Sequence, residues 1–165
     1  MFRRPFKSAA EMDQALVARW NDQVHPDDHV WHLGDFAIKA SPDRVAHLLG
    51  SLNGCKHLII GNNDGPSTVQ ASAWESVSHY AELVVDGTRL ILCHYPFRTW
   101  DGMSSGAYNL HGHCHGRLSR ITRQIDVGVD MWDYRPISLD DLRQRRVARQ
   151  KADCHGPSTI RHPER

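Results

Sequence analysis

Four short polar clusters in this chain carry side chains that bind metal ions. They are Gly34-Asp35, Gly61-Asn62-Asn63-Asp64, the single His94, and Gly112-His113-Cys114-His115. Together they offer a carboxylate, an amide oxygen and three imidazoles. A mixture of oxygen and nitrogen donors without thiolate suits manganese, iron, cobalt, nickel or zinc. The residue types therefore indicate a site for a divalent metal ion.

Each cluster also has an ordinary structural explanation when it is taken alone. Gly-Asp after a strand is usually a turn, and Gly-Asn-Asn-Asp consists of residues that tolerate positive φ. A single histidine such as His94 is more often packed than ligating. Gly-His-x-His is the most specific of the four patterns. All four in one chain, each after an expected strand, favour a metal site over four unrelated turns.

The elements that must position these clusters are strands. Apolar runs at residues 29–33, 57–60, 88–94 and 108–111 predict strands that end at or beside the four clusters. Ligands of α/β sheets collect at the carboxyl ends of strands, so the four segments are expected to converge. If residues 112–116 are extended, His113 and His115 point to the same side and Cys114 points into the core.

The remaining pattern predicts one α/β domain. Helices are expected at residues 8–21, where Ser8 and Glu11 form a capping box, and from Ser41-Pro42 onward. Asp86-Gly87 between two apolar runs predicts a hairpin. A strand is expected at 124–129 and a basic helix at 140–151. We therefore expect a layered α/β sandwich over residues 1–152, followed by a flexible tail at 153–165.

Composition narrows the classes of partner. The 165 residues carry a formal net charge of +1, so the overall electrostatic field does not favour binding to nucleic acid. The expected basic C-terminal helix is the one feature that keeps nucleic-acid binding as an alternative. No secretory signal is visible, and no run approaches the roughly 18 apolar residues that cross a bilayer. We expect a cytoplasmic protein with reduced cysteines and no membrane partner.

The four clusters, in this order, resemble the motifs of the calcineurin-like metallophosphoesterase family, in its small single-domain bacterial or phage form. The likeness covers roughly residues 3–142 and extends to His32-Leu33-Gly34-Asp35-Phe36-Ala37, Cys93-His94-Tyr95-Pro96 and Val127-Gly128-Val129-Asp130. It implies a four-layer α/β/β/α sandwich and hydrolysis of a phosphate ester, chiefly a phosphodiester. It also implies two divalent ions, with Mn²⁺ first and Fe²⁺, Zn²⁺, Ni²⁺ or Co²⁺ as alternatives.

The resemblance assigns a role to individual side chains. Asp35 bridges the two ions, and one ion is completed by Asn62, His94 and His113. His115 serves the second ion. In such a pair the ions activate the attacking hydroxide and neutralise the phosphate oxygens. Arg98 follows the single histidine by four residues and is a candidate to bind a phosphate oxygen of the substrate, although a plain surface arginine is equally consistent.

The chain departs from the family pattern at two places. No Asp-x-His precedes the Gly-Asp motif on an earlier strand, so the first strand is expected to be missing and the second ion to keep only Asp35 and His115. An open sheet edge would lower stability and favour self-association. Asn63 stands at a catalytic position that is usually histidine, and it cannot act as a general acid near neutral pH.

Three functional hypotheses follow. The first is a phosphodiesterase with a low intrinsic rate or an activated ester substrate. The alternative is a catalytically impaired phosphoesterase fold that acts as a binding or scaffold protein. The third is a mononuclear metal hydrolase of another ester.

Overall fold

A computed structural model describes residues 4–119 and 121–144 of the chain. The expected basic helix starts at residue 139 and is helical through 144. Its continuation to residue 151, and the tail expected at 153–165, lie outside the described residues.

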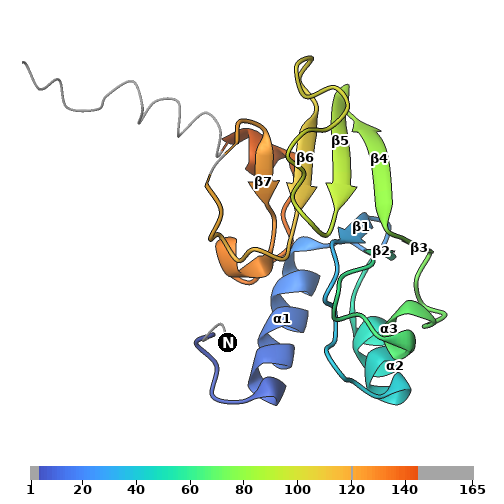
Figure 1. Cartoon of the computed structure of the whole chain (residues 1–165). Helices are drawn as coiled ribbons and strands as arrows, with labels where there is room; N and C mark the ends of the chain where they lie inside the picture. The colour runs from blue at the N-terminus through green and yellow to red at the C-terminus, as the bar shows by residue number, and fades with distance from the viewer. Residues whose placement is uncertain (1–3, 120, 145–165) are drawn as a thin grey trace, which may run out of the picture.

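The first half of the chain forms a parallel sheet with helices between its strands (Figure 1). The helix α1 (Ala9–Gln23) precedes β1 (His29–His32), and α2 (Pro42–Ser51) connects β1 to β2 (Cys55–Ile59). The short α3 (Pro66–Val69) leads to β3 (Ser76–Ser78). The strand order is β1-β2-β3, so β1 is an edge strand among the described residues. The expectation of self-association through this edge stays a prediction.

The second half forms a separate mixed sheet. Its strands are β4 (Tyr80–Val85), β5 (Thr88–Cys93), β6 (Tyr108–His111) and β7 (Gln124–Asp126), in that spatial order. The β4–β5 pair is antiparallel and the other two pairs are parallel. The expected hairpin is confirmed, with Asp86 and Gly87 at φ of 47° and 71°. The strand expected at 124–129 is shorter, because the 3-10 helix η1 (Val129–Met131) begins there.

Local sequence signals account for where the first two long helices begin. The Ser8 hydroxyl accepts a hydrogen bond from the Glu11 N–H at 3.1 Å, and the Ser41 hydroxyl accepts one from the Arg44 N–H at 3.3 Å. The reciprocal half of the capping box is shifted by one residue. The Glu11 carboxylate accepts from the Lys7 N–H at 2.8 Å instead of the Ser8 N–H.

The hydrophobic core lies in three places that define the layers. Leu33 and Ile59 from the first sheet pack with Leu90, Leu92 and other residues of the second sheet. A further cluster joins α2 to the outer face of the first sheet. The outer face of the second sheet is covered by loop residues around Trp100 and Ala107, which pack on the buried Ile91.

The architecture is thus mixed α/β with two sheets packed face to face. In the described residues a helix layer covers only the first sheet, so the four-layer arrangement is not established by them. Among these residues, no helix combines the length and apolar character needed to cross a membrane.

Candidate metal centre

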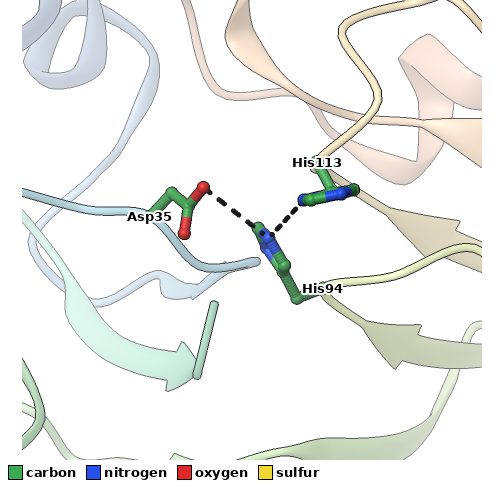
Figure 2. Close-up of side chains that lie close together, drawn as sticks. All are labelled: Asp35, His94 and His113. Carbon is green, nitrogen blue, oxygen red and sulfur yellow. Dashed lines mark hydrogen bonds and ion pairs between the residues drawn. The ribbon is translucent and has the colours of Figure 1, made fainter. Parts of the chain in front are cut away.

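Four of the five predicted ligands meet at one point between the two sheets. The ligating atoms of Asp35, His94 and His113 all lie within 4.8 Å of one another (Figure 2). The His94 Nε2 atom is 3.7 Å from Asp35 Oδ2 and 3.2 Å from His113 Nδ1. It is 3.0 Å from Asn62 Oδ1. The first sheet supplies Asp35 and Asn62 and the second supplies the two histidines, so the expected convergence at strand ends is confirmed.

The hydrogen bonds of His94 show that a positive charge fits between these atoms. Its Nδ1 lies 2.7 Å from the carbonyl oxygen of Leu33, which can only accept, so Nδ1 carries a proton. In the neutral ring Nε2 is then unprotonated and presents a lone pair. It faces the amide oxygen of Asn62 and the carboxylate of Asp35, both of which are acceptors. Of these two oxygens, only Asn62 Oδ1, at 3.0 Å, is within hydrogen-bond distance of Nε2. Two acceptors at that distance repel, and a divalent ion with oxygen and nitrogen ligands would relieve that repulsion.

Asp64 connects the two loops that carry the predicted oxygen ligands. Its Oδ2 accepts from the N–H groups of Asp35 and Gly61, both at 2.8 Å, and its Oδ1 accepts from the Phe36 N–H at 2.8 Å. One carboxylate thus holds the loop after β1 against the loop after β2. The sequence placed Asp64 inside the motif but gave it no role.

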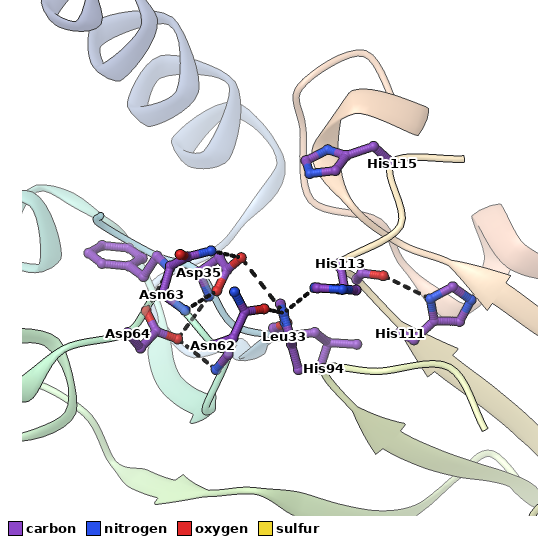
Figure 3. A network of polar contacts seen from close by, with 12 residues as sticks. Leu33, Asp35, Asn62, Asn63, Asp64, His94, His111, His113 and His115 are labelled. Atoms are coloured by element: carbon purple, nitrogen blue, oxygen red, sulfur yellow. Dashed lines mark hydrogen bonds and ion pairs between the residues drawn. The ribbon is translucent and has the colours of Figure 1, made fainter. Parts of the chain in front are cut away.

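Asn63 holds the carboxylate of Asp35. Its backbone N–H donates to Asp35 Oδ1 and its side-chain amide donates to Oδ2, both at 2.8 Å. Asn63 is exposed, so it lies on the solvent side of the cluster (Figure 3). Both carboxylate oxygens therefore have a fixed orientation. A catalytic role for this residue stays a prediction.

Glycine is required where the two loops touch. A Cβ atom on Gly34 would lie 2.5 Å from His94 Nδ1, and Gly34 has a φ of +89°. A Cβ atom on Gly61 would lie 2.4 Å from Asp35 Oδ1. Real Cβ atoms do not approach other atoms so closely, so both positions exclude a side chain.

The ligand-bearing backbone is left-handed at several points. Asp35, His113 and His115 have φ of 58°, 63° and 49°. Residues other than glycine adopt this region rarely, and it costs of the order of 1 kcal/mol or more for each residue. This conformation at Asp35 is stabilised by the hydrogen bonds that Asn63 donates to its carboxylate and by the one that its own N–H donates to Asp64. Such backbone strain concentrates at functional sites.

The extended geometry expected for residues 112–116 is wrong. Because His113 and His115 are left-handed, they do not share one side, and only His113 joins the cluster (Figure 3). The Nδ1 atom of His115 lies 2.7 Å from Asp130 Oδ2 instead. Cys114 is half-buried and not a core residue, since the turn removes the strand alternation on which that expectation relied. Burial raises the pKa of its thiol.

Asp130 is a second residue that the sequence did not single out. Its side chain is 2% exposed and binds both Arg4 and His115. Burial acts to raise the pKa of this carboxyl, but the hydrogen bonds from Arg4 and His115 outweigh it, and the net shift is downward. Arg98 is exposed and forms no hydrogen bond to another described residue, so its role in substrate binding stays a prediction.

Sequence comparison with known proteins places this chain in a family. The chain is 31% identical to the Gene 66 protein of Mycobacterium phage D29, over 80% of this chain and 81% of the phage protein. It is 32% identical to the Gene 66 protein of Mycobacterium phage L5, over 80% of this chain and 79% of that protein. The chain belongs to the Gene 66 protein family of mycobacteriophages. No protein-family model matches it.

Two further similarities extend beyond these phages, one in sequence and one in fold. The uncharacterized protein MJ1445 of Methanocaldococcus jannaschii is 28% identical to this Gene 66 family member, over 83% of this chain and 76% of the archaeal protein. The crystal structure of AQ665 from Aquifex aeolicus, a protein of unknown function, superposes with a TM-score of 0.67 at 21% identity. That match covers 85% of this chain and 86% of the Aquifex chain, so the fold is shared.

Proposed function

We propose that this protein is a metal-dependent phosphoesterase that acts on phosphodiester bonds. The observation that carries the proposal is the group of three candidate ligand atoms around a fourth, His94 Nε2: Asn62 Oδ1 at 3.0 Å, His113 Nδ1 at 3.2 Å and Asp35 Oδ2 at 3.7 Å. The ligands Asp35, Asn62, His94 and His113 would hold the divalent ion, with Mn²⁺ as the first candidate. When bound, such an ion supplies positive charge to the phosphate oxygens and lowers the pKa of a water molecule.

The side chains of the protein contribute fixed positions. The Leu33 carbonyl oxygen fixes the ring of His94 so that Nε2 faces the cluster. The Asn63 amide fixes the carboxylate of Asp35. Because Asn63 and His113 are exposed, the cluster is open to solvent on that side, where an ester can approach. Preorganised groups of this kind need no rearrangement during the reaction.

The proposal is tested by cation binding and hydrolysis in the same samples. Metal-free protein is titrated with Mn²⁺ by calorimetry and then assayed with bis(p-nitrophenyl) phosphate. The variants are Asp35→Asn and His113→Asn, because asparagine tolerates the left-handed backbone at both positions. Exposed His47 on α2 gives the control His47→Asn. We expect both site variants to lose Mn²⁺ binding and hydrolysis, and the control to keep both.

The outcomes separate the three hypotheses. Hydrolysis that survives Asp35→Asn would overturn the proposal. Tight Mn²⁺ binding without hydrolysis of any phosphate ester would overturn it in favour of a scaffold protein. Hydrolysis of carboxylic esters that inorganic phosphate does not inhibit would overturn it in favour of a different mononuclear hydrolase. A cytoplasmic location and the lack of a membrane partner are part of the same proposal.

A further inference from the structure

An exposed tyrosine lies beside the two histidines of the cluster. The ring of Tyr95 is centred 4.9 Å from the ring of His94 and 4.8 Å from that of His113, at interplanar angles of 79° and 65°. Tyr95 is 44% exposed, whereas His94 is 1% exposed. His113 is exposed as well, so Tyr95 and His113 together form part of the solvent-facing rim of the cluster. An aromatic side chain thus borders the place where an ester can approach.

The backbone on both sides of Tyr95 is constrained. Before it, the ring of His94 lies 2.7 Å from the carbonyl oxygen of Leu33, and the carbonyl oxygen of His94 accepts from the Gly112 N–H at 3.1 Å. After it, Pro96 disfavours helical φ and ψ at Tyr95, because the proline ring clashes with the backbone of the preceding residue. The tyrosine ring therefore projects from a segment that has little freedom to turn away from the cluster.

Two side-chain amides of the second sheet hold the same segment at Phe97. Asn109 in β6 is 0% exposed, and its Oδ1 accepts from the Phe97 N–H at 3.1 Å. The side-chain amide of Gln124 in β7 donates to the same oxygen at 2.9 Å and also donates to the Phe97 carbonyl oxygen. Asn109 Nδ2 donates to the Ile91 carbonyl oxygen at 3.3 Å. A buried amide whose oxygen and nitrogen are both bonded rigidifies the segments that it connects, so residues 94–97 are fixed to the sheet.

An exposed ring on a fixed backbone is suited to stacking. Tyrosine presents a large apolar face at a low cost in conformational entropy, because two side-chain torsions set its orientation. Aromatic rings pair in offset-stacked or edge-to-face arrangements at centroid separations of about 4.5–7 Å. The two imidazoles occupy part of the surroundings of Tyr95 in this way, and the exposed part of the ring is open to a further planar group from solvent.

We propose that Tyr95 forms a subsite that stacks a planar aromatic ring, either a nucleobase or an aryl group, esterified to a phosphate at the cluster. This inference rests on the proposed function, because it takes the phosphate to bind beside His94 and His113. Stacking of a base on an aromatic side chain contributes a free energy that corresponds to about 5- to 150-fold in affinity. Tyr95 thus favours esters that carry a planar ring over alkyl esters.

Binding of simple phosphates tests the subsite without turnover. The protein is loaded with Zn²⁺, a candidate ion that is diamagnetic, and is titrated by calorimetry with adenosine monophosphate, phenyl phosphate and methyl phosphate. These compounds share the phosphate and differ in the attached group. We expect a compound with a planar ring to bind more tightly than methyl phosphate. A preference for adenosine monophosphate identifies a nucleobase, and a preference for phenyl phosphate identifies an aryl group. Equal affinities for all three compounds overturn the inference.

Two substitutions at one position isolate the ring. Tyr95→Leu keeps apolar bulk against the histidines but cannot stack, so it should weaken the preferred compound about 5- to 150-fold and leave the affinity for methyl phosphate unchanged. Tyr95→Phe keeps the ring and should retain the wild-type affinities. The control is Val84→Ala, at an apolar side chain of β4 that is 73% exposed, and it should also behave as the wild type. If Tyr95→Leu weakens methyl phosphate equally, the tyrosine only packs against the histidines and the inference is overturned.

Proton NMR of the same complexes reports the stacking directly. The ring current of an aromatic side chain shifts the protons of a group stacked on it upfield. The ring protons of the preferred compound should therefore move upfield on binding to the wild type and to Tyr95→Phe, and this shift should be lost in Tyr95→Leu. A bound ring whose protons show no upfield shift in the wild type, or the same shift in Tyr95→Leu, overturns the inference.

The two proposals fail in different ways. A protein that binds a planar ring through Tyr95 but hydrolyses no phosphodiester loses the proposed function and keeps the subsite. An active enzyme in which Tyr95→Leu leaves the ratio of KM for aryl and alkyl phosphodiesters unchanged keeps the proposed function and loses the subsite. A wild-type protein that binds none of the three phosphates loses both.

Discussion

The carboxylate of Asp64 holds the backbone of Asp35, whose N–H donates to Asp64 Oδ2 at 2.8 Å. The same carboxylate accepts from Phe36 and Gly61, so it bridges the loops after β1 and β2. Neither loop contains a regular element that would otherwise fix its shape. The site therefore depends on a residue that is not itself a ligand.

Replacing Asp64 with asparagine should disorganise the site without removing any ligand. The amide keeps one acceptor oxygen and loses the charge, so at least one backbone N–H loses its partner. We expect the free energy of unfolding to fall by about 1–3 kcal/mol and Mn²⁺ affinity to fall at least about 10-fold. Urea denaturation and calorimetry measure both. Asp27→Asn, at a side chain 93% exposed, is the control, and equal effects in the two variants would contradict the prediction.

The substitution Gly61→Ala should disrupt the arrangement of the clustered side chains through a steric clash alone. The new methyl group would lie 2.4 Å from Asp35 Oδ1, 2.6 Å from the Asp35 N and 2.9 Å from His94 Cε1. All three atoms belong to residues of the site, so relief of the clash must move a ligand. We expect Mn²⁺ binding to be lost while circular dichroism retains the α/β signature. Gly50→Ala is the matched control, since nothing lies within 4 Å of its Cβ position, and within a helix it should stabilise by up to about 1 kcal/mol.

Asn63→His should raise the rate of hydrolysis of esters with poor leaving groups. Asn63 donates to Asp35 but has no proton that it can transfer near neutral pH. A histidine can act as a general acid, and such catalysis contributes about 10²- to 10⁴-fold. The measurement is kcat for an alkyl and for a p-nitrophenyl phosphodiester, side by side. A gain confined to the alkyl ester is expected, and an unchanged ratio would refute the role of this position.

The stability of the protein should rise with pH up to about the ordinary histidine pKa. Burial lowers the pKa of His57 from 6.5, and the neighbouring His29 lowers it further, against an opposing effect of Glu75. In the window between the lowered folded value and 6.5, the unfolded chain binds more protons than the native one. The free energy of unfolding therefore increases with pH through that window and levels off above it.

Chemical denaturation across this pH range tests the assignment. In His57→Gln the free energy of unfolding should rise less steeply with pH. The variant lacks one group whose pKa differs between the folded and unfolded states. The increase with pH should not vanish, since burial also lowers the pKa of His32. His47→Gln, on the exposed face of α2, should keep the wild-type slope. A steeper slope in His57→Gln would show the assignment to be wrong.

Sequence was sufficient to predict that four polar side chains next to strand ends come together. Asp35, Asn62, His94 and His113 follow apolar runs, and the hydrophobic pattern of those runs fixes both the strands and the sheet edge where they end. The Asp86-Gly87 hairpin could likewise be predicted, because Asp-Gly is a residue pair that adopts the positive φ angles of such a turn. Local signals of this kind need no knowledge of tertiary contacts.

The contacts that were missed are long-range. Asp130 and Arg4 are 126 residues apart in the chain, and no spacing rule connects them. The direction of His115 depends on a left-handed backbone in a turn, where the sequence pattern is equally consistent with an extended segment.

The position of the cluster between the two sheets has a consequence for folding. Asp35 and Asn62 belong to one half of the chain, and His94 and His113 to the other. A cation bound by all four therefore stabilises only the conformations in which the halves are docked, by an amount that grows with its free concentration. Mn²⁺ should slow amide hydrogen exchange in β2 and β6 by the same amount. The two sheets would then open in one cooperative event and not in two independent ones.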